Sequence, residues 1–334
     1  MISKTILITG ATGSLGAYLT RYYSRKGYRV LAHGRAAVPP PFLTDFAAYF
    51  SFDLNGEFEL PACDVCIHTA ALSDDKARLP DLLLANEAGT KKLIEKLNQD
   101  TKLIHISSSS VYLPEDMPIK EELAGNQQLS QLSPYGLSKW KSEEMIRKHA
   151  NQKEIYILRP RAFYGAGDCV ILPRILKLVK GTEQPFIQRP GKMDTAVSLT
   201  HYSTIAHAID CCIQQEGTGI KTYNVADKTT YRLIDVVRSL TAKLYGKSLP
   251  EKEVPIAFLK LLSLFKIGGM TKLLVRSFTR NMVLDTGRIE KELGFSPEIT
   301  FEMQLDELVH WINSNGGVER HKTGDKSLAW TADL

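Results

Sequence analysis

The fold of this chain is decided near its amino terminus by the stretch Thr9-Gly10-Ala11-Thr12-Gly13-Ser14-Leu15-Gly16. The apolar run Thr5-Ile6-Leu7-Ile8 precedes it, and apolar residues recur at helical spacing over residues 15–23 behind it. A strand, a glycine-rich turn and a helix in this order form an anion site. The glycines allow a pyrophosphate to approach closely, and the helix N-terminus offers unpaired N–H groups. A purely structural turn is the alternative, but the flanking strand and helix are the context that dinucleotide binding requires, so we predict a dinucleotide site.

The composition is that of a globular enzyme. The chain has 334 residues, of which 43% are hydrophobic and 24% charged, and a formal net charge of +5. It contains no basic and aromatic ribbon, so no nucleic-acid partner is expected, and no apolar run approaches the ~18 residues that span a bilayer. Because the amino terminus runs straight into the first strand, a signal peptide is not expected, and we predict a cytoplasmic protein.

Cysteine usage also favours a reducing compartment. Cys63 and Cys66 form a C-x-x-C pair, but they lie at the entry to an apolar strand and no second pair or histidine spacing accompanies them. We interpret them, with the adjacent Cys211 and Cys212, as buried small hydrophobic residues, and expect no metal site. The role of Cys169, in a loop near the expected site, stays open.

Strand and helix patterns alternate through the first half of the chain. Further strands are expected at 28–32, 64–68, 102–106 and 155–158, and helices at 80–97 and 135–150. This alternation predicts an α/β fold with a doubly wound parallel sheet (Rossmann-like), whose ligand crevice lies at the carboxyl ends of the strands. The pattern loosens after Gly165. We therefore expect a dinucleotide-binding domain over 1–165 and a smaller C-terminal substrate-binding lobe over 166–334, with a return to the sheet near 221–225.

Residue types suited to proton transfer follow the strand at 102–106. Four serines, Ser107 to Ser110, come directly after it, and Tyr135 and Lys139 lie on one face of a later helix, about one turn apart. A lysine ammonium ~5 Å from a phenol, at an effective dielectric of ~20, favours the phenolate by about 3 kcal/mol. That equals roughly 2 pKa units, enough for Tyr135 to act as a general acid/base at neutral pH. The alternatives are that the serines form only a polar turn and that Tyr135 and Lys139 are an ordinary exposed pair on a helix. Because all these residues are expected together at the crevice, we favour the proton-transfer role.

At this point the chain resembles, nearly end to end, the extended short-chain dehydrogenase/reductase family, in its NAD-dependent epimerase/dehydratase group. The matching motifs are Gly10-x-x-Gly13-x-x-Gly16, Phe52-Asp53-Leu54, His68-Thr69-Ala70-Ala71, Asn86, Ser107 to Tyr112, Tyr135-x-x-x-Lys139, Leu158-Arg159-Pro160 and Leu293-Gly294-Phe295.

The resemblance implies roles for particular residues. Ser108, Tyr135 and Lys139 would be catalytic, and Ser109, Ser110 and Arg161 are expected to contact the substrate. The cofactor contacts expected from these motifs are Gly10, Thr12, Gly13, Ser14, Leu15, Gly16, Asp53, Leu54, Ala70, Ala71, Asn86, Tyr135 and Lys139. Arg35 is added as a cofactor contact because of a departure from the family pattern, described next.

The end of the second strand bears on the choice of cofactor. NAD enzymes usually carry an acid there, which binds the ribose 2′-hydroxyl, whereas this chain reads His33-Gly34-Arg35. An arginine suits the 2′-phosphate of NADP through bidentate contact. We therefore expect NADP in preference to NAD. The alternative is an exposed arginine, with the adenosine held in another way.

Two departures from the family pattern bear on the substrate. Nucleotide-sugar members usually carry an asparagine after the Arg-Pro landmark, where this chain has Arg161, and the later segment 197–202 also departs from their pattern. The stretch 158–165 looks closer to the branch of 3β-hydroxysteroid and sterol dehydrogenases. Within 255–278, Leu259, Leu262 and Phe265 form an apolar stripe. It could cap an apolar substrate or rest on a membrane surface, but we favour lobe core.

These observations predict an NAD(P)-dependent oxidoreductase that interconverts a secondary alcohol and a ketone on a largely apolar, sterol-like or long-chain skeleton. A small-molecule substrate and a homodimer are expected. A nucleotide-sugar epimerase or dehydratase is one alternative, for which Arg161, Arg189 or Arg276 could supply cations. A non-catalytic dinucleotide sensor is another, and the intact pair Tyr135 and Lys139 counts against it.

Overall fold

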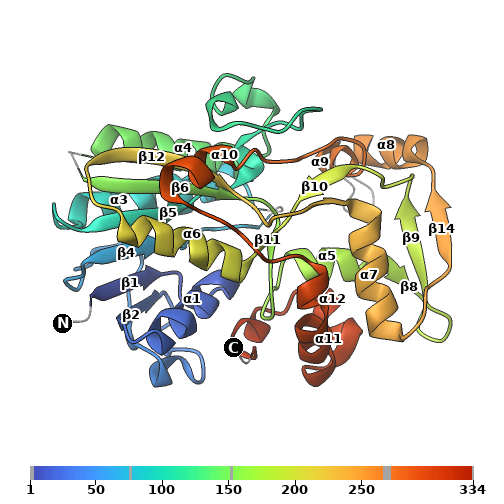
Figure 1. Ribbon diagram of the computed structural model, residues 1–334, viewed down its shortest axis with the longest axis horizontal. Helices are drawn as coiled ribbons and strands as arrows, with labels where there is room; N and C mark the ends of the chain where they lie inside the picture. The colour runs from blue at the N-terminus through green and yellow to red at the C-terminus, as the bar shows by residue number, and fades with distance from the viewer. Residues whose placement is uncertain (1–3, 75–76, 151–152, 266–271, 333–334) are drawn as a thin grey trace.

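A parallel sheet forms the centre of the fold. The computed structural model describes residues 4–74, 77–150, 153–265 and 272–332. Within them, a seven-stranded sheet runs in the order β12-β6-β5-β4-β1-β2-β3, with every pairing parallel (Figure 1). This confirms the predicted doubly wound, Rossmann-like α/β fold. The strands are β1 (Thr5–Thr9), β2 (Arg29–Gly34), β3 (Ala48–Ser51), β4 (Val65–His68), β5 (Lys102–Ile106), β6 (Glu154–Pro160) and β12 (Gly219–Val225).

Helices cover both faces of the sheet because its strands are apolar on both sides. Ile6 and Ile8 of β1 pack in one core with α1 (Ser14–Arg25) and α6 (Tyr202–Gln214). Leu7, between them, points to the opposite face and packs in a second core with α3 (Gly89–Lys96) and α4 (Pro134–His149). The sheet is thus a buried middle layer, and the loops at its carboxyl edge are left to bind ligands.

Two elements of the first half differ from the sequence-based expectation. The edge strand β3 was not expected, because its residues are half-buried or exposed and lack a strong apolar pattern. The helix expected at 80–97 is interrupted: α2 (Leu79–Leu83) leads into a π-helical turn (Leu84–Ala88) and then into α3. Such turns often occur at functional sites, and this one contains Asn86.

The chain beyond β6 builds a second group of elements beside the sheet, in the right-hand part of Figure 1. Its own core contains Leu172, Ile187, Val237 and Trp311. By contrast, α6, β12 and α10 (Gly287–Leu293) pack with the sheet, and Figure 1 shows α10 beside β12. The remaining elements are β7 (Phe163–Tyr164), α5 (Ile171–Leu176), β8 (Val179–Lys180), β9 (Phe186–Pro190), β10 (Ala196–Ser198), β11 (Thr200–His201), β13 (Thr230–Arg232), α7 (Leu233–Tyr245), β14 (Glu251–Val254), α8 (Ile256–Leu264), α9 (Lys272–Ser277), α11 (Leu305–Ser314) and α12 (Gly317–Lys322).

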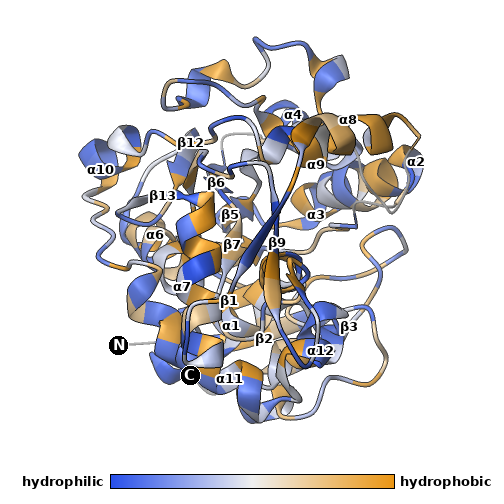
Figure 2. Ribbon diagram, turned by 90° about the vertical axis from the view of Figure 1, so that its right-hand side faces the viewer, coloured by the Kyte–Doolittle hydropathy of each residue, from blue (hydrophilic) through white to orange (hydrophobic). Residues whose placement is uncertain are grey.

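The apolar stripe of α8 is lobe core only in part. Leu259 is buried and Leu262 half-buried, but Phe265 is 69% exposed, so the core interpretation is wrong for that residue. Phe258, Leu261 and Leu264 are also exposed, and Figure 2 shows α8 as a strongly hydrophobic helix at the edge of the molecule. We call these four exposed side chains, Phe258, Leu261, Leu264 and Phe265, the α8 apolar face. In the described part of the chain no helix is long and apolar enough to cross a membrane.

Candidate active site

The glycine loop joins β1 to α1 in a geometry that requires its first and third glycines. Gly10 has a φ of +74°, and a Cβ there would lie 2.7 Å from the backbone of Ala70. A Cβ at Gly16 would lie 2.2 Å from the carbonyl oxygen of Gly10. These contacts hold the loop tightly between β1, the end of β4 and α1.

The middle of the loop is open to a ligand. Gly13 is exposed and is the N-cap of α1, and within the described residues no side chain caps the N-terminus of that helix. Thr12 and Ser14 beside it are half-buried, and Leu15 is buried in the core. Unsatisfied N–H groups at a helix N-terminus are the donors that a pyrophosphate accepts from. The loop therefore fits a dinucleotide.

The segment expected at the adenosine end is held against β2. The Nε2 of His33 donates to the carbonyl oxygen of Phe52 over 2.9 Å, and the two rings stack with centroids 3.9 Å apart. Asp53 follows as an exposed residue whose carboxylate accepts from the amide of Asn55, and Leu54 is buried. Arg35 is exposed just past β2, and its guanidinium has no hydrogen bond or ion pair to any described residue.

Asn86 connects the expected cofactor loop to the helix of the expected catalytic pair. It is fully buried, and its amide accepts from the Leu72 N–H (2.7 Å) and donates to the Leu72 carbonyl (3.0 Å). It also donates to the Ser138 hydroxyl over 2.8 Å. Ala70 and Ala71 precede Leu72, so Asn86 fixes the course of the chain directly after them.

The serines after β5 and the start of α4 lie against each other. Ser108 is 7% exposed, and its Oγ accepts from the Ser110 N–H over 3.1 Å; Ser109 is buried and Ser110 half-buried. A Cβ at Gly136 would lie 2.1 Å from the carbonyl oxygen of Ser110. This close approach brings the first turn of α4 directly onto the serine turn.

Local capping decides where Tyr135 and Lys139 stand on α4. The Ser133 hydroxyl accepts from the Gly136 N–H over 2.9 Å, and Pro134 is the first helical residue. Tyr135 is thus half-buried in the first turn of α4, and Lys139 follows one turn later. The structure brings both residues to the end of β5 that carries Ser108.

Lys139 is buried, and its Nζ is held by the strand. It donates to the carbonyl oxygen of Ile106 over 2.8 Å and lies 3.5 Å from Nε2 of His105. Burial lowers the pKa of Lys139 to about 8, although Glu143 opposes this shift. Burial also lowers the pKa of His105 well below its usual range, so this ring is neutral at pH 7. The ammonium of Lys139 therefore titrates close to working pH.

A buried ion pair that sequence reasoning did not identify lies behind the serines. Arg159 of β6 binds Glu143 of α4 through two hydrogen bonds of 2.9 and 2.6 Å, and Ser107 donates to the same carboxylate over 2.6 Å. Arg159 also donates to the Tyr112 hydroxyl over 2.7 Å. A usable signal was present: Glu143 lies four residues after Lys139 and eight after Tyr135, on the same helix face. The pair anchors the residue just before Ser108.

Arg161, expected at the substrate, follows β6 at the same edge of the sheet. It is partly buried, and its Nε is shielded from solvent without a hydrogen-bond partner in the described structure. Of the other basic candidates, Arg189 is paired with Glu251 (3.0 Å) and Glu253 (2.9 Å), so its charge is already compensated. Arg276 is exposed on α9.

Cys169 ties its loop to the carboxyl-terminal segment. Its Sγ donates to the carbonyl oxygens of Asp325 (3.1 Å) and Gly167 (3.4 Å). Burial raises the pKa of this thiol to about 11, so it is not a thiolate at neutral pH. The contacts indicate a packing role.

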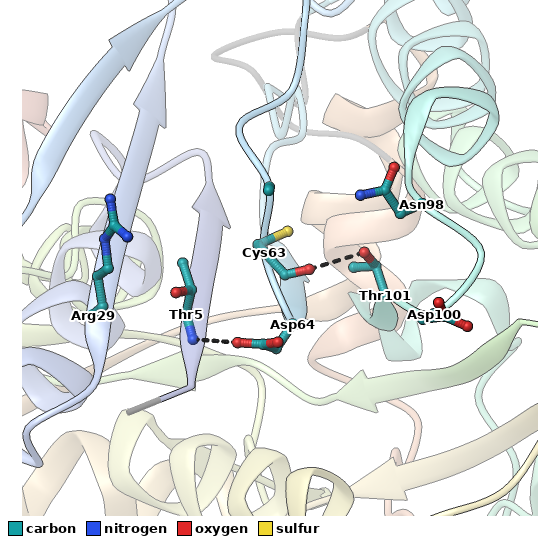
Figure 3. A pocket seen from close by; sticks show the side chains of 8 residues that line it. Thr5, Arg29, Cys63, Asp64, Asn98, Asp100 and Thr101 are labelled. Atoms are coloured by element: carbon teal, nitrogen blue, oxygen red, sulfur yellow. Dashed lines mark hydrogen bonds between the residues drawn. The ribbon is translucent and has the colours of Figure 1, made fainter. Parts of the chain in front are cut away.

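A hollow of about 390 Å³ lies at the opposite edge of the sheet (Figure 3). It is lined by residues at the amino ends of the strands, and its Asp64 already accepts from the Thr5 N–H over 2.6 Å. Parallel sheets of this type bind ligands at their carboxyl edge, where the glycine loop and the serine turn lie. We therefore place the candidate site at the carboxyl edge. The lining residues of the hollow are Thr5, Arg29, Ala62, Cys63, Asp64, Asn98, Asp100 and Thr101.

Fold and site together define an enzyme of the extended short-chain dehydrogenase/reductase type. Residues 6–226 match the family described as the NAD dependent epimerase/dehydratase family, and the chain belongs to that family. The match covers the glycine loop, the serine turn, the Tyr-Lys pair and β12. The resemblance inferred from the sequence motifs is therefore confirmed.

Individual relatives are distant and differ in chemistry. The uncharacterized protein YbjS of Escherichia coli is 26% identical over 94% of this chain and 99% of its own length. A sterol-4-alpha-carboxylate 3-dehydrogenase (decarboxylating) of Dictyostelium discoideum is 22% identical over 91% of this chain and 100% of its own. Among solved structures, MoeE5 in complex with UDP-glucuronic acid and NAD aligns with a TM-score of 0.73 at 21% identity, covering 93% of this chain and 99% of its own. This last likeness shows the fold.

Proposed function

We propose that this enzyme interconverts a secondary alcohol and a ketone on a largely apolar skeleton, with net turnover of its nicotinamide cofactor. The observation that carries the proposal is the placement of Ser108, Tyr135 and Lys139 together at the end of β5. The bound nicotinamide supplies or accepts the hydride. The Tyr135 hydroxyl gives a proton to the ketone oxygen or takes one from the carbinol, and the Ser108 hydroxyl hydrogen-bonds the same oxygen. The charge of Lys139 favours the phenolate form of Tyr135.

NADP is the proposed cofactor, in preference to NAD. Arg35 stands just past β2 with an exposed guanidinium that no described residue engages, and no acid occupies the end of that strand. A guanidinium binds a phosphate in bidentate fashion, whereas it cannot make this two-pronged contact with a single ribose 2′-hydroxyl. Asp53 and Leu54 are proposed to contact the adenine, and Ala70, Ala71 and Asn86 to line the middle of the cofactor.

An apolar substrate is supported from two directions. The chain lacks the asparagine that nucleotide-sugar members carry after the Arg-Pro landmark, and one full-length relative acts on a sterol carboxylate. The α8 apolar face, with the exposed Lys260 beside it, supports contact with an anionic membrane surface, from which a lipid-like substrate could be taken.

A nucleotide-sugar epimerase or dehydratase is the second candidate. It is favoured by the close fold likeness to MoeE5, which was solved with UDP-glucuronic acid. Arg161 and Arg276 are the basic residues that could face a diphosphate. A non-catalytic sensor is disfavoured, because it would not need the pair Tyr135 and Lys139. The homodimer and the cytoplasmic location stay predictions, which light scattering and cell fractionation would test.

A binding and turnover screen separates the two candidates. NADP-loaded protein is melted in the presence of UDP-hexoses, sterol-like ketones or long-chain keto compounds, and NADPH oxidation is followed for each. We expect stabilisation and turnover with the apolar ketones. Stabilisation by a UDP-sugar, with none by the apolar compounds, would establish the epimerase alternative instead.

A further inference from the structure

Arg161 carries a charge that the described protein does not compensate. It is the first residue after β6, its Nε is shielded from solvent, and its guanidinium makes no hydrogen bond or ion pair to any described residue. Arg159, two residues earlier, is also buried but is fully paired with Glu143. Desolvating a guanidinium without an anion is costly, and buried charges in proteins are normally paired. An anion from outside the chain would remove this cost.

A second arginine strengthens the positive field at this place. Burial lowers the pKa of Arg161 to about 10, and the nearby charge of Arg174 on α5 acts in the same direction. Arg161 therefore still carries its proton at pH 7.

The backbone of Arg161 is held in place on both sides. The Thr200 hydroxyl accepts from the Arg161 N–H over 3.0 Å and lies 2.9 Å from the Arg161 carbonyl oxygen, within hydrogen-bond distance. The next residue, Ala162, has a φ of +42°, which costs a residue with a Cβ about 1–3 kcal/mol by general estimates and is typical of functional sites. A fixed and strained backbone is unusual for a surface arginine, but it suits one that must meet a ligand in one orientation.

The position relates Arg161 to the reacting end of the substrate. The Ser107 N–H donates to the Leu158 carbonyl over 2.7 Å, so β5 and β6 end side by side. Neighbouring strands lie ~4.8 Å apart. Arg161 is therefore within side-chain reach of the region served by Ser108.

We propose that Arg161 binds a carboxylate of the substrate, close to the carbon that is oxidised or reduced. The inference rests on the proposed function and narrows it: the substrate is a hydroxy or keto acid on an apolar skeleton. The planar fork of the guanidinium matches the two oxygens of a carboxylate. A phosphate of the cofactor presents related oxygens, and the experiment distinguishes the two sources.

The test compares a long-chain 3-keto acid with its methyl ester, using NADPH and purified protein. Charge-assisted hydrogen bonds support a preference for the acid of roughly 10- to 100-fold in kcat/KM. Arg161→Leu should reduce the acid-to-ester ratio to about one, and Arg161→Lys should restore part of it. Arg189→Leu is the matched control, because Arg189 already has acidic partners; it should leave the ratio unchanged.

Two further measurements do not depend on turnover. Ligand-free Arg161→Leu should melt at a higher temperature than wild type, because an uncompensated charge is gone. With NADP saturating, a long-chain carboxylate should raise the melting temperature of wild type but not of this variant.

Three outcomes would overturn the inference. Equal activity on acid and ester, with Tyr135→Phe inactive on both, would refute the carboxylate while the proposed function stands. A tenfold loss of NADPH affinity in Arg161→Leu, with the acid preference retained, would assign the anion to the cofactor. If neither compound is reduced, the proposed function fails, and the absence of carboxylate stabilisation would then refute the inference separately.

Discussion

The Nζ of Lys139 donates a hydrogen bond of 2.8 Å to the carbonyl oxygen of Ile106, the last residue of β5. Through this contact the helix that carries Tyr135 is fixed to the strand that leads to Ser108. The same burial that makes the contact strong lowers the pKa of Lys139 to about 8. The positive charge at the candidate site is therefore sensitive to pH near neutrality.

Replacing Tyr135 by Phe tests the proton-transfer role directly. The variant keeps the ring but loses the hydroxyl, so kcat should fall by at least ~10²-fold, the lower range for a positioned acid or base. Steady-state oxidation of NADPH measures this. Tyr245→Phe is the control and should keep its activity, because Tyr245 of α7 packs against the lobe core that contains Val237 and Trp311. Near-normal turnover in Tyr135→Phe would refute the assignment.

The pH profile should report the titration of Lys139. Its pKa is lowered from the ordinary ~10.4 to about 8, so the ammonium is present below pH 8 and is lost above it. Because that charge favours the Tyr135 phenolate, kcat/KM should decline as the pH rises above about 8. An alkaline limb that stays unchanged in Lys139→Arg, whose side chain keeps its charge, would contradict this explanation.

Lys139→Met should stabilise the free enzyme while abolishing its activity. Between about pH 8 and ~10.4 the unfolded chain holds a proton on Lys139 that the folded chain has released, so stability rises with pH over this window. Below pH 8 the buried charge costs the folded state up to about 3 kcal/mol. The variant also loses the hydrogen bond to Ile106, which offsets part of this cost. We therefore expect a net increase of about 1–3 kcal/mol in the free energy of unfolding at pH 7. Urea unfolding at pH 7 and pH 10 measures it, and the gain should shrink at pH 10.

Arg35→Ala should change the choice of cofactor. NADP affinity should fall by at least ~10-fold, because a bidentate phosphate contact is lost, while NAD affinity changes little. Calorimetric titration with both cofactors gives the two values. Arg29→Ala removes an exposed arginine at the other end of the same strand and serves as the control. If the wild-type enzyme prefers NAD, the proposed contact between Arg35 and the 2′-phosphate is wrong and the adenosine is held in another way.

The α8 apolar face should bind anionic vesicles. Phe258 and Leu261 are each about half exposed, at 52% and 53%, and insertion of such side chains at a membrane interface is favourable. In a sedimentation assay with vesicles that contain phosphatidylserine, the wild-type protein should pellet with the vesicles, and Leu261→Glu should stay in the supernatant. Met303→Glu alters an apolar residue on another element that is exposed to a similar degree, at 61%, and this variant should still bind. Equal sedimentation of all three proteins would exclude α8 as the contact.

The part of the site that could be predicted from sequence is the part encoded by local spacing. The glycines from Gly10 to Gly16 and the pair Tyr135 and Lys139 lie within single turns or helices, so their relative positions follow from strand and helix geometry. The family and the parallel sheet followed from the order of these motifs.

What escaped prediction depends on partners that meet only in the folded chain. Arg159 and Glu143 are 16 residues apart and pair across β6 and α4, and nothing in either local sequence selects the other. The uncompensated charge of Arg161 is visible only as an absence of such a partner among the described residues. The exposure of Phe265 likewise could not be read from an apolar stripe, because helical spacing defines a face but not what covers it.

The contact between Gly136 and Ser110 limits how this enzyme can be re-engineered. Any side chain at position 136 would place a carbon 2.1 Å from a backbone oxygen, which cannot move without shifting the serine turn. Saturation libraries that include this codon would consist almost entirely of inactive clones. Substitutions that aim at new substrates are better made in the lobe beyond β6, because they leave the contact between α4 and the serine turn after β5 intact.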